Sequence, residues 1–132
     1  MLQWASMSGR RLAPCPDKRN CVSTQSTDPA KRLPALGFEG ELEPVRAAIL
    51  DVLAEAPRAR VVEAEGDYIH AEFTTLMFRF VDDVEFSIDP GAKRVDFRSA
   101  SRVGHSDLGT NRRRMKKLSR RLDGRAGLVL FS

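Results

Sequence analysis

The stretch from residue 67 to residue 114, DYIHAEFTTLMFRFVDDVEFSIDPGAKRVDFRSASRVGHSDLGTNRRR, decides the fold of this chain. Apolar and polar residues alternate along it with a period of two, which is typical of strands that bury one face. Turn-forming residues interrupt the alternation, and a polar loop then leads into an arginine-rich segment. The stretch therefore predicts three or four consecutive strands followed by the start of a helix.

The alternation places the expected strands and the turns between them. We expect strands over residues 58–65, 68–73, 76–88 and 94–99, with Thr74-Thr75 as a two-residue hairpin loop. In that register His70 lies opposite Arg79, and Glu72 lies opposite Met77, on the outer face. The apolar positions expected on the inner face are Ile69, Ala71, Phe73, Leu76, Phe78, Phe80, Val84, Phe86 and Ile88.

One inward position in this pattern is occupied by a carboxylate, Asp82. Either the strand bulges at Asp82 and Asp83, or the Asp82 side chain points into the core and must find a partner there. The turn at residues 89–91 sets Phe86 opposite Phe97 and Glu85 opposite Arg98 in the next strand.

Helical periodicity flanks the strands on both sides. The first helix is expected from about residue 41 to Pro57, and the second begins at Thr110 and ends near Gly124. Their apolar or buried faces are Val45, Ala48, Ile49, Val52 and Leu53 in the first helix, and Asn111, Met115, Leu118 and Leu122 in the second.

These elements predict an α+β domain over residues 37–132, preceded by an irregular arm over residues 1–36 that carries a cysteine pair. The sheet is expected to be antiparallel with four to five strands, the apolar tail at residues 128–131 being the candidate fifth. Both helices are expected to pack on one face of the sheet.

Composition limits the classes to which the chain can belong. An apolar content of 42% and a charged content of 30% are those of a globular domain, and no apolar run could span a bilayer. No export signal is recognisable after either Met1 or Met7, both of which could be the first residue, so we expect a cytoplasmic location. Oligomeric state is not encoded in any feature of the sequence.

Charge is distributed unevenly along the chain. Residues 110–132 carry eight Lys or Arg against Asp123 alone, whereas residues 1–109 carry fourteen basic and seventeen acidic residues. The basic segment could pair with the acidic one or face an anionic partner, either a small anion or an acidic protein or membrane surface. Nucleic acid is not expected, because no aromatic residues are interleaved with the basic ones.

Three segments, CPDKRNCVSTQ, FVDDVEF and RSASRVGHSDLGTNRRR, resemble a bacterial and plastid family catalogued as domain of unknown function 1499. The chain departs from the family at Arg19, where proline is usual, and at His105, where an aromatic residue is common. It also carries Lys116 and Lys117 where the family often has an acidic residue. The resemblance implies no activity, and relatives are often tethered to membranes, exported or plastid proteins. The residues that carry it are Cys15, Asn20, Cys21, Ser23, Gln25, Asp82, Asp83, Glu85, Arg98, Ser99, Ser101, Arg102, Gly104, Asp107, Gly109, Asn111 and Arg112.

The start of the second helix is the candidate site. Arginines at 112, 113 and 114 oppose the positive end of the helix dipole, so negative charge is expected beside them. That charge could come from a bound anion or from an internal network of Asp82, Asp83, Glu85 and Asp107. The residues expected to bind an anion or an acidic partner are Arg98, Ser99, Ser101, Arg102, His105, Asn111, Arg112 and Arg113.

Cysteine and histidine leave further alternatives open. Cys15 and Cys21 could form a disulfide in an exported protein, or remain two thiols in a cytosolic one. Their spacing is not that of a zinc site, and no metal or cofactor is expected. The leading hypothesis is a non-enzymatic binding or scaffolding module; the alternative is a small enzyme that uses Asp82, Asp83 and His105 in acid–base chemistry.

Overall fold

The structure is a computed structural model that describes residues 11–131, so the choice between Met1 and Met7 as first residue lies outside the described residues. The described part of the chain contains two helices and seven strands. In chain order they are β1 (Cys21–Ser23), β2 (Leu36–Gly37), α2 (Leu42–Glu55), β3 (Ala59–Glu65), β4 (Tyr68–Thr74), β5 (Val81–Asp89), β6 (Arg94–Ser101), α3 (Thr110–Leu122) and β7 (Val129–Leu130).

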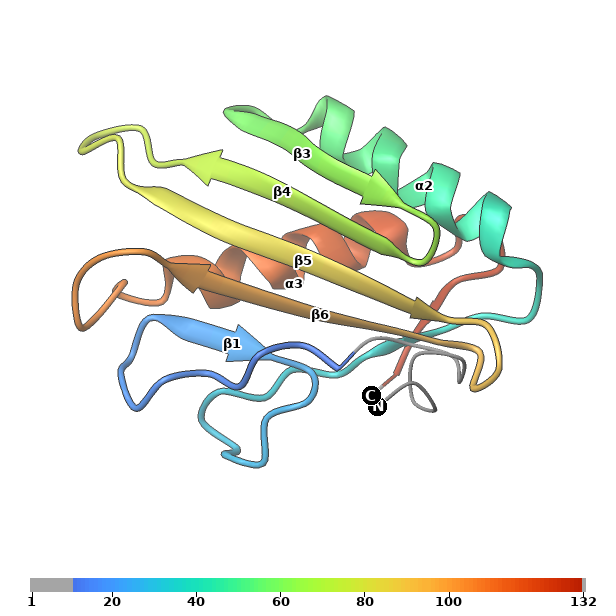
Figure 1. Cartoon of the computed structure of the whole chain (residues 1–132), viewed down its shortest axis with the longest axis horizontal. Helices are drawn as coiled ribbons and strands as arrows, with labels where there is room; N and C mark the ends of the chain where they lie inside the picture. The colour runs from blue at the N-terminus through green and yellow to red at the C-terminus, as the bar shows by residue number, and fades with distance from the viewer. Residues whose placement is uncertain (1–10, 132) are drawn as a thin grey trace.

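All of these strands belong to one antiparallel sheet in the order β3-β4-β5-β6-β2-β7, with β1 also paired to β6. Both helices lie behind the sheet in Figure 1, so the α+β class is confirmed. The expectation of four to five strands is wrong. The arm adds β1 and its end adds β2, so the arm is less irregular than its prolines suggested.

The hairpin between β4 and β5 is the second correction. Its loop spans residues 75–80, instead of the two threonines expected, and Phe73 pairs with Asp82. This slip of an even number of residues leaves every side chain on its expected face, so alternation cannot distinguish the two registers. The observed register lets β5 pair along its length with both β4 and β6, and the residues expected inward at the start of the strand become loop residues.

The pairing of β5 with β6 agrees with the expected one. Phe86 lies opposite Phe97, with ring centroids 6.2 Å apart, and Glu85 lies opposite Arg98. The five apolar positions expected in the first helix are all buried against the sheet, as are the four expected in the last. Edge strand β7 confirms that the apolar tail docks on the sheet.

The arm is held on the domain by β1 and by side-chain bonds. Cys15 and Cys21 form a disulfide that closes the segment leading into β1. Thr24 donates from its hydroxyl to the buried Asp96 carboxylate over 2.6 Å. The arm therefore lies along β6 and reaches the start of α3, which places residues far apart in sequence around one cleft.

Candidate functional site

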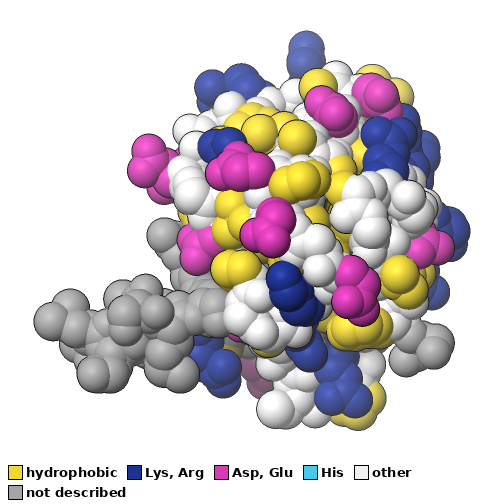
Figure 2. Space-filling view, turned by 90° about the vertical axis from the view of Figure 1, so that its right-hand side faces the viewer, with side chains coloured by type: hydrophobic (Ala, Val, Ile, Leu, Met, Phe, Trp, Pro, Cys, Tyr) yellow, Lys and Arg dark blue, Asp and Glu magenta, His cyan; other side chains and the backbone are white. Residues whose placement is uncertain are grey.

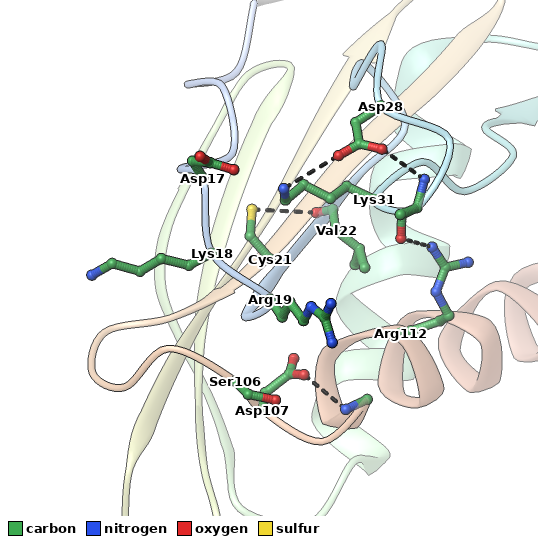
Figure 3. Close-up of a pocket in the computed structure, with 12 residues that line it drawn as sticks. Asp17, Lys18, Arg19, Cys21, Val22, Asp28, Lys31, Ser106, Asp107 and Arg112 are labelled. Atoms are coloured by element: carbon green, nitrogen blue, oxygen red, sulfur yellow. Dashed lines mark hydrogen bonds and ion pairs between the residues drawn. The ribbon is translucent and has the colours of Figure 1, made fainter.

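A cleft of about 680 Å³ lies between the arm and the start of α3 (Figure 3). Arm residues 17–31 form one wall, and Ser106, Asp107, Gly109 and Arg112 form the other. The cleft adjoins the polar loop that follows β6, where the sequence predicted an anion site. It is therefore the candidate site.

Four cationic residues, Lys18, Arg19, Lys31 and Arg112, line this cleft, and Figure 3 shows the Lys18 side chain pointing away from the other three. Arg112 donates to the carbonyl of Ala30 over 2.6 Å, which ties α3 to the arm without neutralising the guanidinium. Lys31 pairs with Asp28 at 3.3 Å. Within residues 11–131, no carboxylate lies within 4.0 Å of the Arg19 or Arg112 guanidinium.

The start of α3 is capped internally by Asp107. Its carboxylate accepts the backbone N–H of Gly109 at 2.8 Å and that of Asn111 at 3.0 Å. Gly109 has φ 83°, a left-handed conformation that favours glycine and lets the chain turn into the helix. The negative charge beside the positive end of the α3 dipole thus comes from Asp107. The side chains of Arg112, Arg113 and Arg114 each contact a different partner.

Arg114 turns inward to the buried Asp82 carboxylate, with Nη2 and Oδ2 2.7 Å apart. Asp82 is 1% exposed, and pairing is continuous on both sides of it, so the strand does not bulge there. Arg114 also lies 4.8 Å from the centroid of the Phe73 ring. Of the two alternatives for Asp82, the structure shows the buried, paired carboxylate.

Asn111 joins this buried pair to the polar residues of β6. Its Oδ1 accepts from Ser99 at 2.5 Å and from Arg114 at 2.9 Å. Its Nδ2 donates to Ser101, to Asp107 and to the carbonyl of Asn20. Ser99 and Asn111 are fully buried, and with the half-buried Ser101 they hold the helix, the sheet and the arm together.

The opposite face of the sheet carries a separate cluster centred on Arg102. Arg102 bonds Asp83 at 2.8 and 2.9 Å and Glu72 at 2.6 Å, while His70 contacts Asp83 at 2.8 Å. Hydrogen bonds from Arg102 are the main cause that lowers the pKa of both Asp83 and Glu72, and the two carboxylates raise the pKa of Arg102. Arg60 also bonds Glu72 at 3.0 Å, so two guanidinium groups balance the two carboxylates of the cluster.

The cross-strand pair of Glu85 and Arg98 lies beside that cluster. Their charged atoms are 3.7 Å apart, Tyr68 donates its hydroxyl to Glu85, and Arg98 donates to the carbonyl of Pro14 at 3.4 Å. This pair thus fastens the arm to the sheet, and Arg98 does not reach the cleft.

Of the expected binding residues, Arg112 is the one that lines the cleft. His105 is exposed in the loop after β6, and its carbonyl accepts from the backbone N–H of Arg19. Arg113 points away and donates to the carbonyl of Leu108 at 3.0 Å. Asp82 and Asp83 face opposite sides of the sheet, so the structure does not bring them together with His105 as acid–base partners.

Sequence reasoning missed Arg19 and Lys31 as cleft residues. The available signal was Arg19 itself, a cation where proline is usual in the sequences the chain resembles. Among residues 11–131, no group of three His, Cys, Asp or Glu side chains is arranged to hold a metal ion. In the same part of the chain, neither helix has the length and apolar character needed to cross a bilayer.

The family model described as "Protein of unknown function (DUF1499)" matches residues 11–122 of the chain. The match includes the cleft, the buried network and the cluster around Arg102. No curated protein and no solved structure matches the chain.

Proposed function

We propose that the chain, which belongs to the DUF1499 family of proteins of unknown function, is a binding module that takes an anionic group in the cleft between the arm and α3. The group is a phosphate or carboxylate, carried either by a small molecule or by an acidic partner. The proposal assigns no bond-making step to the protein.

The observation that carries this proposal is the environment of Arg19. Its guanidinium has no carboxylate within ion-pair distance among the described residues, although it points into a cleft lined by three more cationic residues. Figure 3 shows the Arg19 and Arg112 side chains reaching into the same space between β1 and α3. Two guanidinium groups with free donors suit the oxygen atoms of one anionic group.

Three acidic residues line the cleft; Asp17 forms no ion pair with a cation among residues 11–131, and the other two are already engaged. Asp107 is engaged by the α3 backbone, and Asp28 is engaged by the backbone N–H of Ala30 and by Lys31, which together lower the pKa of Asp28. A ligand anion is therefore favoured on the side of Arg19 and Arg112. A cleft of about 680 Å³ lies within the range of about 300–1,000 Å³ that small-molecule sites occupy.

The enzymatic alternative receives less support from the same geometry. Acid–base catalysis needs a titratable group that is free to exchange a proton beside a substrate. Asp82 is engaged by Arg114 in the core, and Asp83 is engaged by Arg102 and His70. These commitments favour a structural role for both carboxylates.

Isothermal titration with pyrophosphate at low salt tests the proposal. We expect binding by the wild type, a loss of about tenfold in affinity for Arg19→Ala, and weaker binding as salt rises, since exposed charges are screened. Arg113→Ala is the matched control, because it removes the same charge outside the cleft. Equal affinity in all three proteins, or no binding by the wild type, would contradict the proposal.

A further inference from the structure

Six exposed apolar residues gather at one end of the molecule, in the loop of residues 75–80 and the loop of residues 102–109. We call this surface the apolar tip. Its most exposed members are Leu108 at 84%, Met77 at 80% and Leu76 at 74%. The complete set is Leu76, Met77, Phe78, Phe80, Val103 and Leu108.

The two loops of the apolar tip lie side by side. Arg102 donates its backbone N–H to the carbonyl of Val81, and side chains from both loops surround a shared hollow of about 310 Å³. Figure 1 shows both loops at the left end of the sheet. At the other end, shown in Figure 2, acidic, basic and hydrophobic side chains are interspersed.

Two hydrogen bonds hold the hairpin loop of residues 75–80 in its exposed conformation. Thr75 donates its N–H to the carbonyl of Phe80 at 2.8 Å, and its hydroxyl accepts the N–H of Phe80 at 2.9 Å. The rings of Phe78 and Phe80 stack with centroids 5.5 Å apart, although both remain exposed. The apolar side chains are thus presented outward by an ordered loop and add little to the core, which marks an interaction site.

Basic residues surround the apolar tip. Arg79 lies within the loop itself, and Arg113 lines the hollow between the two loops. Arg58 and Lys117 line the neighbouring cleft that Leu76 also borders. In the described residues, none of these four cations has a carboxylate within ion-pair distance, and the two acids of the hollow, Asp82 and Asp107, have internal partners.

We propose that the apolar tip binds the surface of an anionic lipid bilayer. Exposed apolar side chains at the tip of two adjoining loops can enter the boundary between head groups and acyl chains, while the surrounding cations stay at the level of the phosphates. A protein partner would require a broader complementary surface. The charge of the surrounding cations favours anionic lipid over a neutral membrane.

Vesicle co-sedimentation tests this inference. We expect the wild type to bind vesicles of phosphatidylcholine with phosphatidylglycerol, and to bind pure phosphatidylcholine far more weakly. The double substitution Leu76→Ser with Phe78→Ser should lower the partition coefficient by about tenfold or more. Val129→Ser is the matched control, because Val129 is 57% exposed on the edge strand β7, away from the tip.

Unchanged binding by the double variant would overturn the inference, as would absence of wild-type binding to anionic vesicles. Sedimentation velocity tests whether the tip instead binds a second copy of the chain. That outcome is shown if the wild type self-associates and the double variant does not. Because the substituted side chains are exposed, thermal unfolding should show that the variant folds normally. Arg19→Ala should still bind vesicles, which separates this inference from the anion cleft.

Discussion

Asp82 is a charged residue at a position that the strand pattern reserves for apolar side chains. The structure pairs its Oδ2 with Arg114, which reaches from α3 and is itself held by Asn111 and packed on Phe73, while its Oδ1 is buried without a hydrogen-bond partner. A carboxylate in the core is tolerated because its partner is fixed by several further contacts. The pair thereby sets the position of α3 on the sheet.

Replacement of Asp82 by Ala should lower the free energy of unfolding by about 3–5 kcal/mol, because it leaves the Arg114 guanidinium buried without its partner. Denaturant unfolding followed by circular dichroism measures the change. Asp51→Ala, at an exposed position of α2, is the control and should change stability by less than about 0.5 kcal/mol. An unchanged midpoint for Asp82→Ala would show that the pair is not structural.

Arg102→Ala should raise the pKa of Asp83 and of Glu72 toward their ordinary values, because hydrogen bonds from Arg102 are the main cause of their lowering. Carboxylates with a lowered folded pKa stabilise the fold above their unfolded pKa, and that contribution is lost as pH falls below about 4. The wild type should therefore lose more stability on acidification than the variant. Carbon-13 titration of the side-chain carboxyl groups measures both pKa values.

Lys117→Ala is the control for this titration, since Lys117 has no carboxylate partner among residues 11–131. Its removal should leave both carboxyl titrations where they are in the wild type. Titration of Asp83 and Glu72 at the same pH in wild type and Arg102→Ala would show that Arg102 does not control their protonation.

At the scale of elements, the β4–β5 hairpin shows what period-two alternation can and cannot predict. Alternation assigned the inner face of both strands correctly, because that face follows from parity alone. It could not fix the loop length, because a shift by an even number of residues preserves the pattern. Two-residue hairpin turns need residues that adopt φ > 0, and neither Thr74 nor Thr75 favours that conformation. The sequence itself therefore argued against so short a loop.

The corrected hairpin predicts a contrast between two apolar substitutions. Leu76→Ser should change the free energy of unfolding by less than about 0.5 kcal/mol, because Leu76 is exposed. Phe86→Ala should destabilise by about 3–5 kcal/mol, because Phe86 is buried against Phe97. Chemical denaturation compares the two variants. A large loss of stability for Leu76→Ser would show that Leu76 is buried, as the shorter Thr74-Thr75 loop would require.

The arm offers a second prediction at this scale. Reduction of the bond between Cys15 and Cys21 should destabilise the protein by roughly 2–3 kcal/mol, by releasing the segment that leads into β1. Thermal unfolding with and without a reductant measures this, and a Cys15→Ser, Cys21→Ser double variant should not respond.

Mass spectrometry after alkylation of free thiols decides whether the bond is present in purified protein. Two alkylated cysteines would contradict the disulfide. Because disulfides persist in oxidising compartments, the same measurement bears on the cytoplasmic location expected from the sequence.

At the scale of the whole molecule, the uneven charge along the chain is partly resolved by folding. The basic C-terminal segment pairs with acidic residues from the rest of the chain, as Arg114 does with Asp82 and Arg121 with Glu55. Among the described residues, cations without an ion pair include Arg19 and Arg112 in the cleft and those beside the apolar tip. The sequence indicated that a surplus of positive charge existed, and the fold shows where these cations lie.

The fold class, the helices and the pairing of β5 with β6 could be predicted, because they follow from local periodicity and a recognisable turn. The cleft could not, because it forms where the arm crosses α3, and that crossing follows from long-range contacts such as Arg112 to the carbonyl of Ala30. The expected binding residues were chosen by their neighbourhood in sequence. In the fold, Ser99 and Asn111 are buried, and Arg19 lines the cleft.

Amide chemical-shift mapping with pyrophosphate at low salt tests the central claim, an anion site in the cleft, most directly. The account predicts that the largest shifts fall on Arg19, Lys31, Gly109 and Arg112, which line the cleft from two distant parts of the chain. Shifts centred on Arg79, Arg113 and Lys117, or spread evenly over exposed cations without a centre at the cleft, would contradict it.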